Sequence, residues 1–438
     1  MKNSRFLADY GMIFVLVLLC AFFSVVTYSD QSPTGETAAK QVVSAIRQQF
    51  GNVPCVLIAA GNQPGDTAFA SSVGRELTAS GAQVVATVKG EPKDAREALV
   101  KINAAGGKLD AVACTQVTGA WLVFSDLKTD FPALGEPRVV TPRIYRWPTF
   151  LNSENLLNIA GQIAVIAIVA IGMTMVIITG GIDLSVGSLI ALSAVLATRF
   201  IRDFADGVNA SFAGMLLACI AAIILCGMVG GFSGVMITRF AIPPFIVTLS
   251  MLLVGSGLAY ILSKNESIYQ IPESFVRLDR GAMLLNLPNA VVLMLILYAL
   301  AHVLMSRMKL GRHLYAVGGN SEAARLAGVP VKRVIMLAYI ASAMLAGLGG
   351  VLMASRLKSG SATYGNMYEM WVISAAVVGG TSLTGGQGKV FGTLIGAFII
   401  AVIQNGMNLT NIESQTQKVV LGLVILGAVL LDKIRHSR

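Results

Sequence analysis

The sequence is poor in charged residues, histidine and cysteine for its length. Only 13% of its 438 residues are Asp, Glu, Lys or Arg, whereas soluble domains carry about 25%. The three histidines and five cysteines lack the spacing of metal ligands, so we expect no metal and no bound cofactor. A complete phosphate-binding loop is also missing, because Leu383 and Val390 occupy two of its required positions around Gly388-Lys389. The chain is therefore expected to be no enzyme and not to hydrolyse ATP itself.

Apolar residues, by contrast, make up 55% of the chain and gather in long runs. About ten runs approach the roughly 20 residues that a membrane-spanning helix needs. They lie at about 11–27, 159–179, 184–201, 212–237, 243–263, 288–306, 334–356, 370–384, 389–409 and 418–431. The pattern predicts an α-helical polytopic membrane protein with about ten transmembrane helices. The net charge of +10 is then typical of loops that orient such helices, and we expect no nucleic-acid partner.

One polar loop, 307–333, is strongly basic and lies between two apolar runs. Basic residues gather on the cytoplasmic side of membrane proteins, which predicts a cytoplasmic loop. Those in this loop are Arg307, Lys309, Arg312, Arg325, Lys332 and Arg333. The loop also has the signals of a short helix, since Asn320 or Ser321 can cap its start and Gly328 can close its end. A short exposed helix is a surface that a soluble partner can bind; an ordinary basic loop is the alternative.

The first apolar run follows a short basic start, and we interpret residues 1–29 as a retained transmembrane helix. A cleaved signal peptide is the alternative, but no clear small-residue cleavage site follows the run. With 307–333 in the cytoplasm, counting the runs places both termini there too. Residues 30–148 then lie outside the cytoplasm, and residues 149–438 form the transmembrane domain.

Residues 30–148 differ in composition from the rest of the chain and predict a small inserted α/β domain. Strand patterns alternate with helix patterns, as is typical of a parallel sheet covered by helices. The expected strands are 53–60, 83–88, 109–114 and 138–140, and the expected helices run to about 80 and over 92–105 and 119–127. Ligands of such sheets bind at the loops that follow the strands, here 61–66 and 115–119. Cys55 and Cys114 would lie most of a strand length apart, too far for a disulfide.

The segment 53–141 resembles the N-terminal lobe of a sugar-binding periplasmic protein. Those proteins close two lobes on their ligand, so the resemblance implies only half of a ligand cleft. A docking or spacer domain without a ligand is the alternative.

Two glycine-rich turns, 180–188 and 379–388, interrupt the apolar runs. Both fit the pattern Gly-Gly-x-x-Leu-Ser/Thr-x-Gly, as expected of an internal repeat or of two tight helix breaks. The first turn contains Asp183. An ionisable residue at membrane depth is a candidate for a functional site, whereas the alternative is that Asp183 or Ser185 caps the next helix.

Six segments together resemble the ribose, galactose and xylose class of ABC importer permeases, from about residue 149 to the C-terminus. They are Phe150–Asn158, Gly180–Ser188, Ile242–Thr248, Tyr315–Arg325, Val378–Gly386 and Val402–Gly406. The resemblance implies a homodimer in the lipid of the bacterial inner membrane, supplied by an extracytoplasmic solute-binding protein and driven by a cytoplasmic ATPase that holds Mg-ATP. It also implies that the ATPase binds the short helix of the basic loop. The residues expected to contact it are Gly319, Asn320, Glu322, Ala323, Ala324, Arg325 and Gly328.

We therefore expect a permease subunit that translocates a small polar solute, best matched to a monosaccharide, by alternating access. The residues expected near its path are Asp183, Ser185, Thr248, Glu369 and Asn405. Each of them has a cap or an interhelical hydrogen bond as its alternative role. The chain departs from the family pattern in two places: the insertion 30–148, and Trp371 at the place of an acidic residue. The second departure leaves the substrate class open.

Two other functions remain as alternatives. An ion-coupled secondary transporter needs intramembrane carboxylates, and the apolar runs contain very few. A membrane receptor would sense solute through 30–148, but the tail after Asp432 is too short for an output domain.

Overall fold

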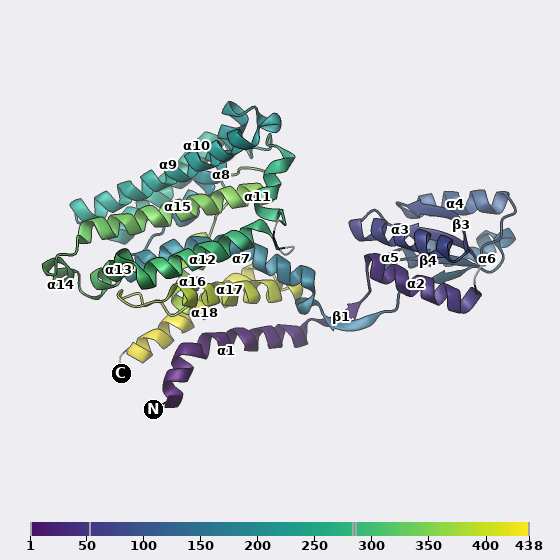
Figure 1. The fold of residues 1–438 in the computed structure, drawn as a ribbon, viewed down its shortest axis with the longest axis horizontal. Helices are drawn as coiled ribbons and strands as arrows, with labels where there is room; N and C mark the ends of the chain where they lie inside the picture. Colours follow the sequence, from purple (N-terminus) through teal and green to yellow (C-terminus); the bar gives the residue numbers. More distant parts are fainter. Residues whose placement is uncertain (1, 52–53, 283, 285–286, 437–438) are drawn as a thin grey trace. The chain divides into compact units, whose positions relative to one another are not determined.

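The computed structural model describes residues 2–51, 54–282, 284 and 287–436 of the chain. The chain forms two compact units (Figure 1). One consists of Met1–Thr27 and Phe150–Arg438, and the other of Tyr28–Thr149. The first unit is built from helices, whereas the second combines strands and helices.

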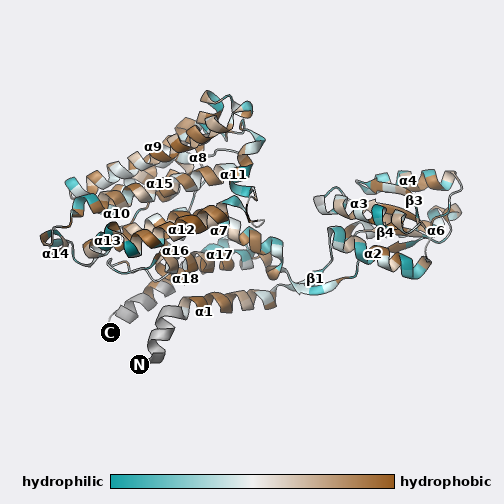
Figure 2. Cartoon of the chain, viewed as in Figure 1, coloured by the Kyte–Doolittle hydropathy of each residue, from teal (hydrophilic) through white to brown (hydrophobic). Residues whose placement is uncertain are grey.

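The helices of the first unit coincide with the apolar runs of the sequence, which Figure 2 shows in brown. The longer ones are α1 (Lys2–Val26), α7 (Ser153–Ile178), α8 (Val186–Phe204), α9 (Phe212–Arg239), α10 (Pro244–Ser263), α12 (Asn289–Arg307), α15 (Val331–Leu357), α16 (Tyr368–Val378), α17 (Val390–Leu409) and α18 (Ser414–His436). Among the described residues, six helices are long and apolar enough to cross a membrane: α7, α9, α10, α12, α15 and α17. The prediction of a polytopic helical membrane protein is therefore confirmed.

One helix is shorter than its apolar run. The run was expected to continue from 370 to 384, but α16 ends at Val378. Gly379 and Gly380 follow, and Gly380 has a φ of 82°, which a helix does not allow. The glycine pair therefore ends the helix although the residues beyond it are still partly apolar.

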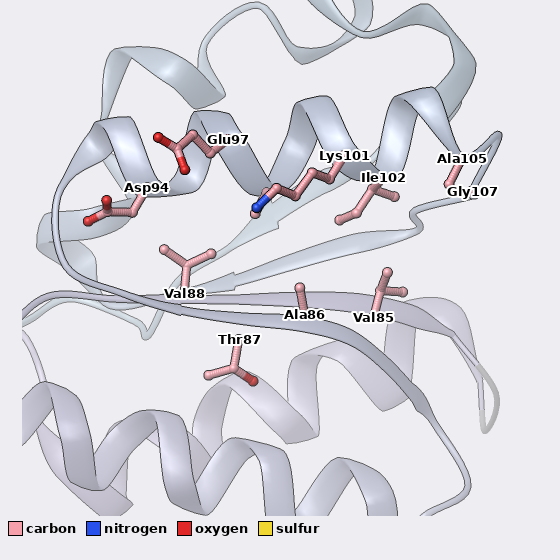
Figure 3. A pocket seen from close by; sticks show the side chains of 11 residues that line it. Val85, Ala86, Thr87, Val88, Asp94, Glu97, Lys101, Ile102, Ala105 and Gly107 are labelled. Atoms are coloured by element: carbon pink, nitrogen blue, oxygen red, sulfur yellow. The ribbon is translucent and has the colours of Figure 1, made fainter.

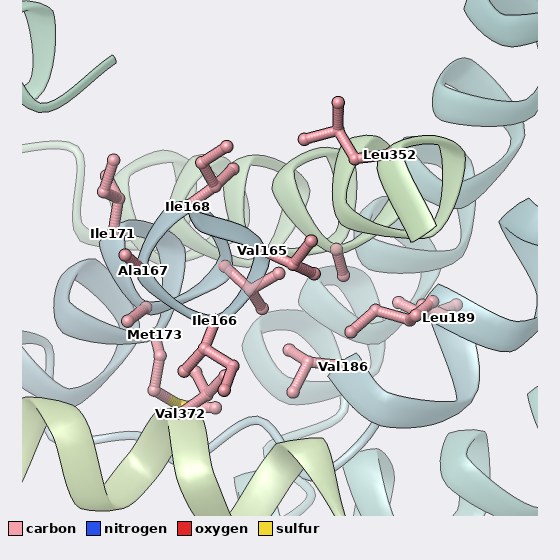
Figure 4. Packing of buried hydrophobic residues seen from close by; sticks show 14 of the residues in the cluster. Val165, Ile166, Ala167, Ile168, Ile171, Met173, Val186, Leu189, Leu352 and Val372 are labelled. Atoms are coloured by element: carbon pink, nitrogen blue, oxygen red, sulfur yellow. The ribbon is translucent and has the colours of Figure 1, made fainter. Parts of the chain in front are cut away.

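Helix α7 forms the centre of the first unit. In its most apolar stretch, 89% of the residues are buried. Apolar character alone does not require this, because α9 is as apolar as α7 and yet only 33% of its most apolar stretch is buried. Neighbouring helices therefore enclose α7 in a way that they do not enclose α9. Figure 4 shows Val165 and Ile168 of α7 with Leu352 of α15 and with Val186 and Leu189 of α8.

Small residues let α9 and α15 approach each other closely. A Cβ atom at Gly230 would lie 2.6 Å from the Cβ of Ala343, and one at Gly234 would lie 2.9 Å from the Cα of Met336. Close packing of this kind is a main source of helix association in lipid, where the hydrophobic effect between helices is lost.

The second unit contains a four-stranded parallel sheet in the order β3-β2-β4-β5. Its strands are β2 (Cys55–Ala60), β3 (Gln83–Lys89), β4 (Ala111–Cys114) and β5 (Arg138–Val140). The predicted parallel sheet is therefore present; position 53, where the first strand was expected to start, lies outside the described residues. Helices α2 (Gly35–Phe50) and α3 (Pro64–Ala79) pack on one face, and α4 (Pro92–Ala104) packs on the other.

The helix predicted over 119–127 is wrong. The chain instead forms α5 (Gln116–Gly119), a single 3-10 turn at Leu122–Phe124 and α6 (Leu127–Asp130). Trp121 interrupts them with an extended backbone, φ −65° and ψ 132°. Its ring stacks on Phe124 with centroids 6.0 Å apart, so burial of these aromatic rings against the sheet overrides local helix formation.

A second, two-stranded sheet was not predicted. Strand β1 (Tyr28–Gln31) pairs antiparallel with β6 (Tyr145–Pro148), and the side chains of Ser29 and Gln31 hydrogen-bond Thr149. Both connections of the chain between the two units pass through this ribbon.

The cysteines of the second unit do not form a disulfide. Cys55 and Cys114 are both free thiols. In the register of β2 and β4, Cys114 lies opposite Ala59 rather than opposite Cys55. The predicted separation of the two thiols along the sheet is thus confirmed.

Candidate functional site

A small polar cavity lies between α8, α10 and the segment that leads into α16. Its volume is about 190 Å³. It is lined by Gly187, Ser188 and Ala191 of α8, by Leu252, Ser256 and Tyr260 of α10, and by Ala362, Thr363, Tyr364, Gly365, Asn366 and Glu369. Six of its twelve lining residues carry a hydroxyl or amide group, and Glu369 supplies a carboxylate. Such a surface can orient a small polar solute through several hydrogen bonds.

Glu369, which was expected near the path, is the one member of that set that lines the cavity. It lies in the first turn of α16, where the helix dipole favours a carboxylate. The carboxylate packs against Gly187 at the start of α8, and a Cβ atom at Gly187 would collide with it. The same Cβ would lie 2.6 Å from the carbonyl oxygen of Gly365. A glycine is therefore required where α8 meets the third wall of the cavity.

The turn before α8 holds Asp183 and Ser185 beside the middle of α15. The Asp183 carboxylate accepts hydrogen bonds from Ser185 N at 3.0 Å, from Ser185 Oγ at 2.6 Å and from Ser342 Oγ at 2.8 Å. Both residues are buried and lie outside the cavity lining. Ser188, which does line the cavity, donates its hydroxyl to Ser185 O at 2.8 Å. Asp183 therefore orders the turn, and hydrogen bonds through Ser185 and Ser188 connect it to the cavity.

Thr248 of α10 is buried against the same turn. Its hydroxyl lies 3.2 Å from Ile182 O and 3.0 Å from Pro244 O. Thr248 thus joins α10 to the turn and does not face the cavity lining.

Asn405 of α17 lies in a different place. Its amide pairs with the amide of Asn155 through bonds of 2.8 and 3.1 Å, and Asn155 also donates to Phe150 O at 2.8 Å. The geometry gives Asn405 an interhelical role, as in the alternative considered for it, between α17 and the start of α7.

The basic loop forms two helices, α13 (Lys309–Gly319) and α14 (Ser321–Leu326). Asn320 caps α14, because its Oδ1 accepts the backbone N–H groups of Glu322 at 3.1 Å and Ala323 at 2.9 Å. The predicted short helix is therefore confirmed, and Asn320 is its N-cap.

All residues of helix α14 except one are exposed. Ala324 is buried, whereas Leu326, a large apolar residue, is 78% exposed. Glu322 and Arg325 form an ion pair on the exposed side. Leu326 and the ion pair thus lie on a side of α14 that no other part of the unit covers.

Two glycines flank α14. Gly328 follows it with a φ of 82° and donates its N–H to Arg325 O at 3.0 Å, which closes the helix. Gly319 precedes it, and a Cβ atom there would have no neighbour within 4 Å. Gly319 is therefore not required by packing within the unit.

Helix α13 connects the loop to the interior of the unit. The Tyr315 hydroxyl donates to Gly388 O at 2.8 Å, in the second glycine-rich turn. In the same turn, Gly386 N donates to Ile178 O at the end of α7, also at 2.8 Å. A Cβ atom at Gly318 would lie 2.5 Å from Gly386 N. The loop, the end of α7 and the second turn therefore meet at one point.

Comparison with known proteins decides the family. Residues 155–429 match the family described as branched-chain amino acid transport system / permease component. The chain belongs to this permease family. The permease is thus a multi-pass membrane subunit of an ABC importer, and not an enzyme.

Several relatives of the permease are named for sugars. The ribose import permease protein RbsC of Bacillus subtilis (strain 168) is 41% identical over 288 residues, which cover 65% of this chain and 87% of that protein. RbsC of Escherichia coli (strain K12) is 39% identical over 289 residues, with the same two shares. The D-allose transport system permease protein AlsC of Escherichia coli (strain K12) is 34% identical over 285 residues, 65% of this chain and 85% of that protein. No solved structure matches the permease.

The sequence pattern of the permease did not single out most of its cavity residues. Ser188, Ser256 and Tyr364 come from three separate segments, and nothing local relates them. The available signal was the polar stretch 358–367, which lies between two apolar runs. Trp371, where the permease departs from the family pattern, packs on Tyr368 with ring centroids 5.0 Å apart and lies outside the cavity lining.

Sequence inspection also missed a buried ion pair of the permease. Arg356, at the end of α15, makes bonds of 2.8 Å through Nε and Nη2 to both carboxylate oxygens of Asp279 in α11 (Arg277–Arg280). Arg356 Nη2 also donates to Gly161 O of α7, and Ser355 Oγ accepts from Asp279 N at 3.1 Å. This cluster joins α7, α11 and α15.

Proposed function

We propose that the permease moves a monosaccharide across the bacterial inner membrane by alternating access, driven by ATP. The observation that carries the proposal is the cavity of hydroxyl and amide groups between α8 and α10. The relatives named for ribose and D-allose support it. The working unit is a homodimer with a separate ATPase, which binds Mg-ATP, and an extracytoplasmic solute-binding protein.

The chemistry of the cavity favours a sugar over an amino acid or an anion. A sugar hydroxyl both donates and accepts hydrogen bonds, as do Ser188, Ser256 and Asn366. Tyr260 and Tyr364 add rings that contact apolar C–H faces and carry a polar hydroxyl. The described residues of the cavity lining include no Lys or Arg, so the carboxylate of an amino acid would have no side-chain cation there.

Coupling to ATP hydrolysis runs through the basic loop. The partner ATPase binds α14 and its flanks, from Gly319 to Gly328, where Ala323 and Leu326 are exposed. Movement of α13 then pulls on the end of α7 and on the second glycine-rich turn through Tyr315 and its hydrogen bond to Gly388. Transport requires only that this junction of α13, α7 and the second glycine-rich turn has two arrangements. One opens the path to the cytoplasm and the other opens it to the outside.

The topology follows from the same loop. With α14 in the cytoplasm, ten helices cross the membrane, both termini are cytoplasmic and residues 30–148 lie outside. The test is to introduce cysteine at Ser125 and at Ser321, both exposed, and to label intact cells with a membrane-impermeant maleimide. Only S125C is expected to react; labelling of S321C from outside would contradict the topology.

The second unit, in this scheme, is an extracytoplasmic domain that docks or modulates solute delivery. It resembles one lobe of a two-lobed binding protein, and one lobe buries only part of a small ligand. We therefore expect weak sugar binding by this unit, if any.

Uptake of a radiolabelled sugar panel tests the proposal. Cells should produce the permease together with the ATPase and solute-binding protein that co-purify with it. Ser256→Val is expected to reduce uptake at least tenfold, because it leaves a sugar hydroxyl without a partner. Ser250→Val is the matched control, since Ser250 is an exposed serine on the same helix. Equal uptake by both variants for every sugar would overturn the assignment of the cavity.

A further inference from the structure

The edge of the parallel sheet in the second unit has a groove beside it. Strand β3 is the outermost strand of this sheet and, within the part of the chain that the structure describes, pairs with β2 alone. A groove of about 510 Å³ lies between β3 and α4 (Figure 3). Its floor is apolar, with Val85, Ala86, Val88 and Ile102, and its rim is charged, with Asp94, Glu97 and Lys101.

Backbone groups at this edge have no partner among the described residues. Gly90 N, directly after β3, donates to Ala60 O of β2 at 3.1 Å. Because backbone groups alternate in direction along a strand, those of Val88 also point toward β2, whereas those of Thr87 and Lys89 point outward. Unpaired groups of this kind are a template for a further strand.

We infer that this edge pairs with the same edge of a second copy, so that the two α/β units of a permease dimer share one continuous sheet. The inference rests on the proposed homodimer and adds the surface through which its second units meet.

The positions along the edge fit a two-fold axis at Thr87. In an antiparallel pair centred there, each Thr87 exchanges both backbone hydrogen bonds with the other, and Lys89 lies opposite Val85 of the second copy. The two grooves then meet on the same face of the sheet, with the two α4 helices antiparallel. A two-fold contact requires such self-complementarity.

The charges on α4 are complementary about the same axis. In Figure 3, Glu97 lies on the Val88 side of Thr87, and Lys101 lies on the Ala86 side. The axis therefore brings Glu97 of each copy next to Lys101 of the other. Neither side chain has an ion pair within 4.0 Å among the described residues, although Lys93 on the same helix also attracts Glu97.

Two features limit the length and strength of this strand pairing, so it requires two copies that are already held together. Val85 lies at a β-bulge, since the register with β2 shifts between Val56 and Leu57, and Lys89 ends the strand. Bulges and lysines limit uncontrolled edge pairing. Tethering two copies in one dimer raises their effective concentration to the order of millimolar, which permits a short ladder to form.

Disulfide trapping in membranes that contain the full-length permease tests the inference. In the proposed pair the Thr87 Cα atoms are about 5.5 Å apart, within the roughly 4.4–6.8 Å of a disulfide. Thr87→Cys is expected to convert at least half of the chain to a cross-linked dimer under mild oxidation. Ser71→Cys, an exposed control on α3, and the native cysteines should give less than a tenth.

Charge variants sharpen this test. Adding E97K to T87C should lower cross-linking at least threefold, because the introduced lysine would face Lys101 of the second copy. Adding K101E to the T87C/E97K variant should restore cross-linking. A general disturbance of the fold by either substitution would not be reversed in this way.

Co-purification of two differently tagged copies separates the inference from the proposed function. Co-purified copies without T87C cross-linking, or T87C cross-linked to another protein, would overturn the edge pairing alone. Failure of the two tags to co-purify would overturn the homodimer of the proposed function.

Discussion

Arg356 and Asp279 form a two-pronged ion pair in which only 3% of the Asp279 side chain is exposed. The two residues are far apart in the sequence, yet they join α15 to the short helix α11, and Arg356 also bonds the backbone of α7. Planar, paired hydrogen bonds of this kind give fixed geometry as well as attraction. The pair therefore holds the segment before α12 onto the helix bundle.

Removing one partner of this ion pair should lower the free energy of unfolding far more than removing both. Arg356→Met leaves a buried carboxylate unpaired, and a loss of about 3–5 kcal/mol is typical of such a change. The double variant R356M/D279N should regain most of that loss. Thermal unfolding of the purified permease in detergent measures both.

The neighbouring pair Lys358–Glu273 is the matched control, because Glu273 is 86% exposed. Exposed pairs contribute about 0–1 kcal/mol, so E273Q should leave the unfolding temperature nearly unchanged. A midpoint for R356M that is no lower than that of E273Q would contradict the structural role of the buried pair.

Gly187→Ala should strongly reduce uptake without unfolding the permease. The new methyl group collides with the Glu369 carboxylate and with Gly365 O, so α8 must move away from the third wall of the cavity. We expect an at least tenfold lower uptake rate. Gly257→Ala on α10 is the control, since a Cβ atom there meets no neighbour within 4 Å, and it should transport normally.

Bulky residues on α14 should uncouple ATP hydrolysis from transport. In Ala323→Trp the large side chain lies on the exposed side of the helix, so the fold should persist while the ATPase no longer seats correctly. Uptake should fall at least tenfold, and less ATPase should co-purify. Substitution of the buried Ala324 would instead disturb packing and is unsuitable for this test. Unchanged uptake and unchanged co-purification of A323W would contradict the docking of a partner at α14.

The thiol of Cys114 should be inert in the folded protein at neutral pH. Burial behind the sheet raises its pKa to about 12, because the thiolate loses its hydration, while the Thr118 hydroxyl opposes the shift weakly. The raised pKa stabilises the folded state fully below the ordinary pKa of about 9, and this contribution is lost as the pH rises toward 12. Alkylation by iodoacetamide, followed by mass spectrometry, should modify Cys114 at pH 8 only after unfolding. Rapid modification in the native protein would show that the thiol is accessible.

Local signals in the sequence predicted local structure well. The cap at Asn320 and the closure at Gly328 depend on residues within one helical turn, and both are present. The strand ending at Cys114 was also recognisable, because a short apolar run bounded by polar residues needs no distant partner to be identified. The helix over 119–127 failed because Trp121 and Phe124 bury their rings against the sheet, which a local pattern does not register.

Long-range relationships could not be predicted in this way. Arg356 and Asp279 are each ordinary loop or helix-end charges until the fold brings them together. Asp183 and Glu369 both qualified as candidates for the path, yet only the packing of α8 on residues 362–369 decides that Glu369 lines the cavity. Ser188 and Tyr364 show the same limit, since a cavity is a property of packed helices rather than of any one segment.

The energy source is the central claim, and reconstituted vesicles test it most directly. The permease should be incorporated with its co-purifying ATPase and solute-binding protein, and uptake of labelled ribose and D-allose measured with ATP inside or outside. We expect uptake of at least one sugar only when ATP is present on the side that α14 faces, and no uptake driven by a proton or sodium gradient. Uptake driven by an ion gradient in vesicles that contain the permease alone would contradict it.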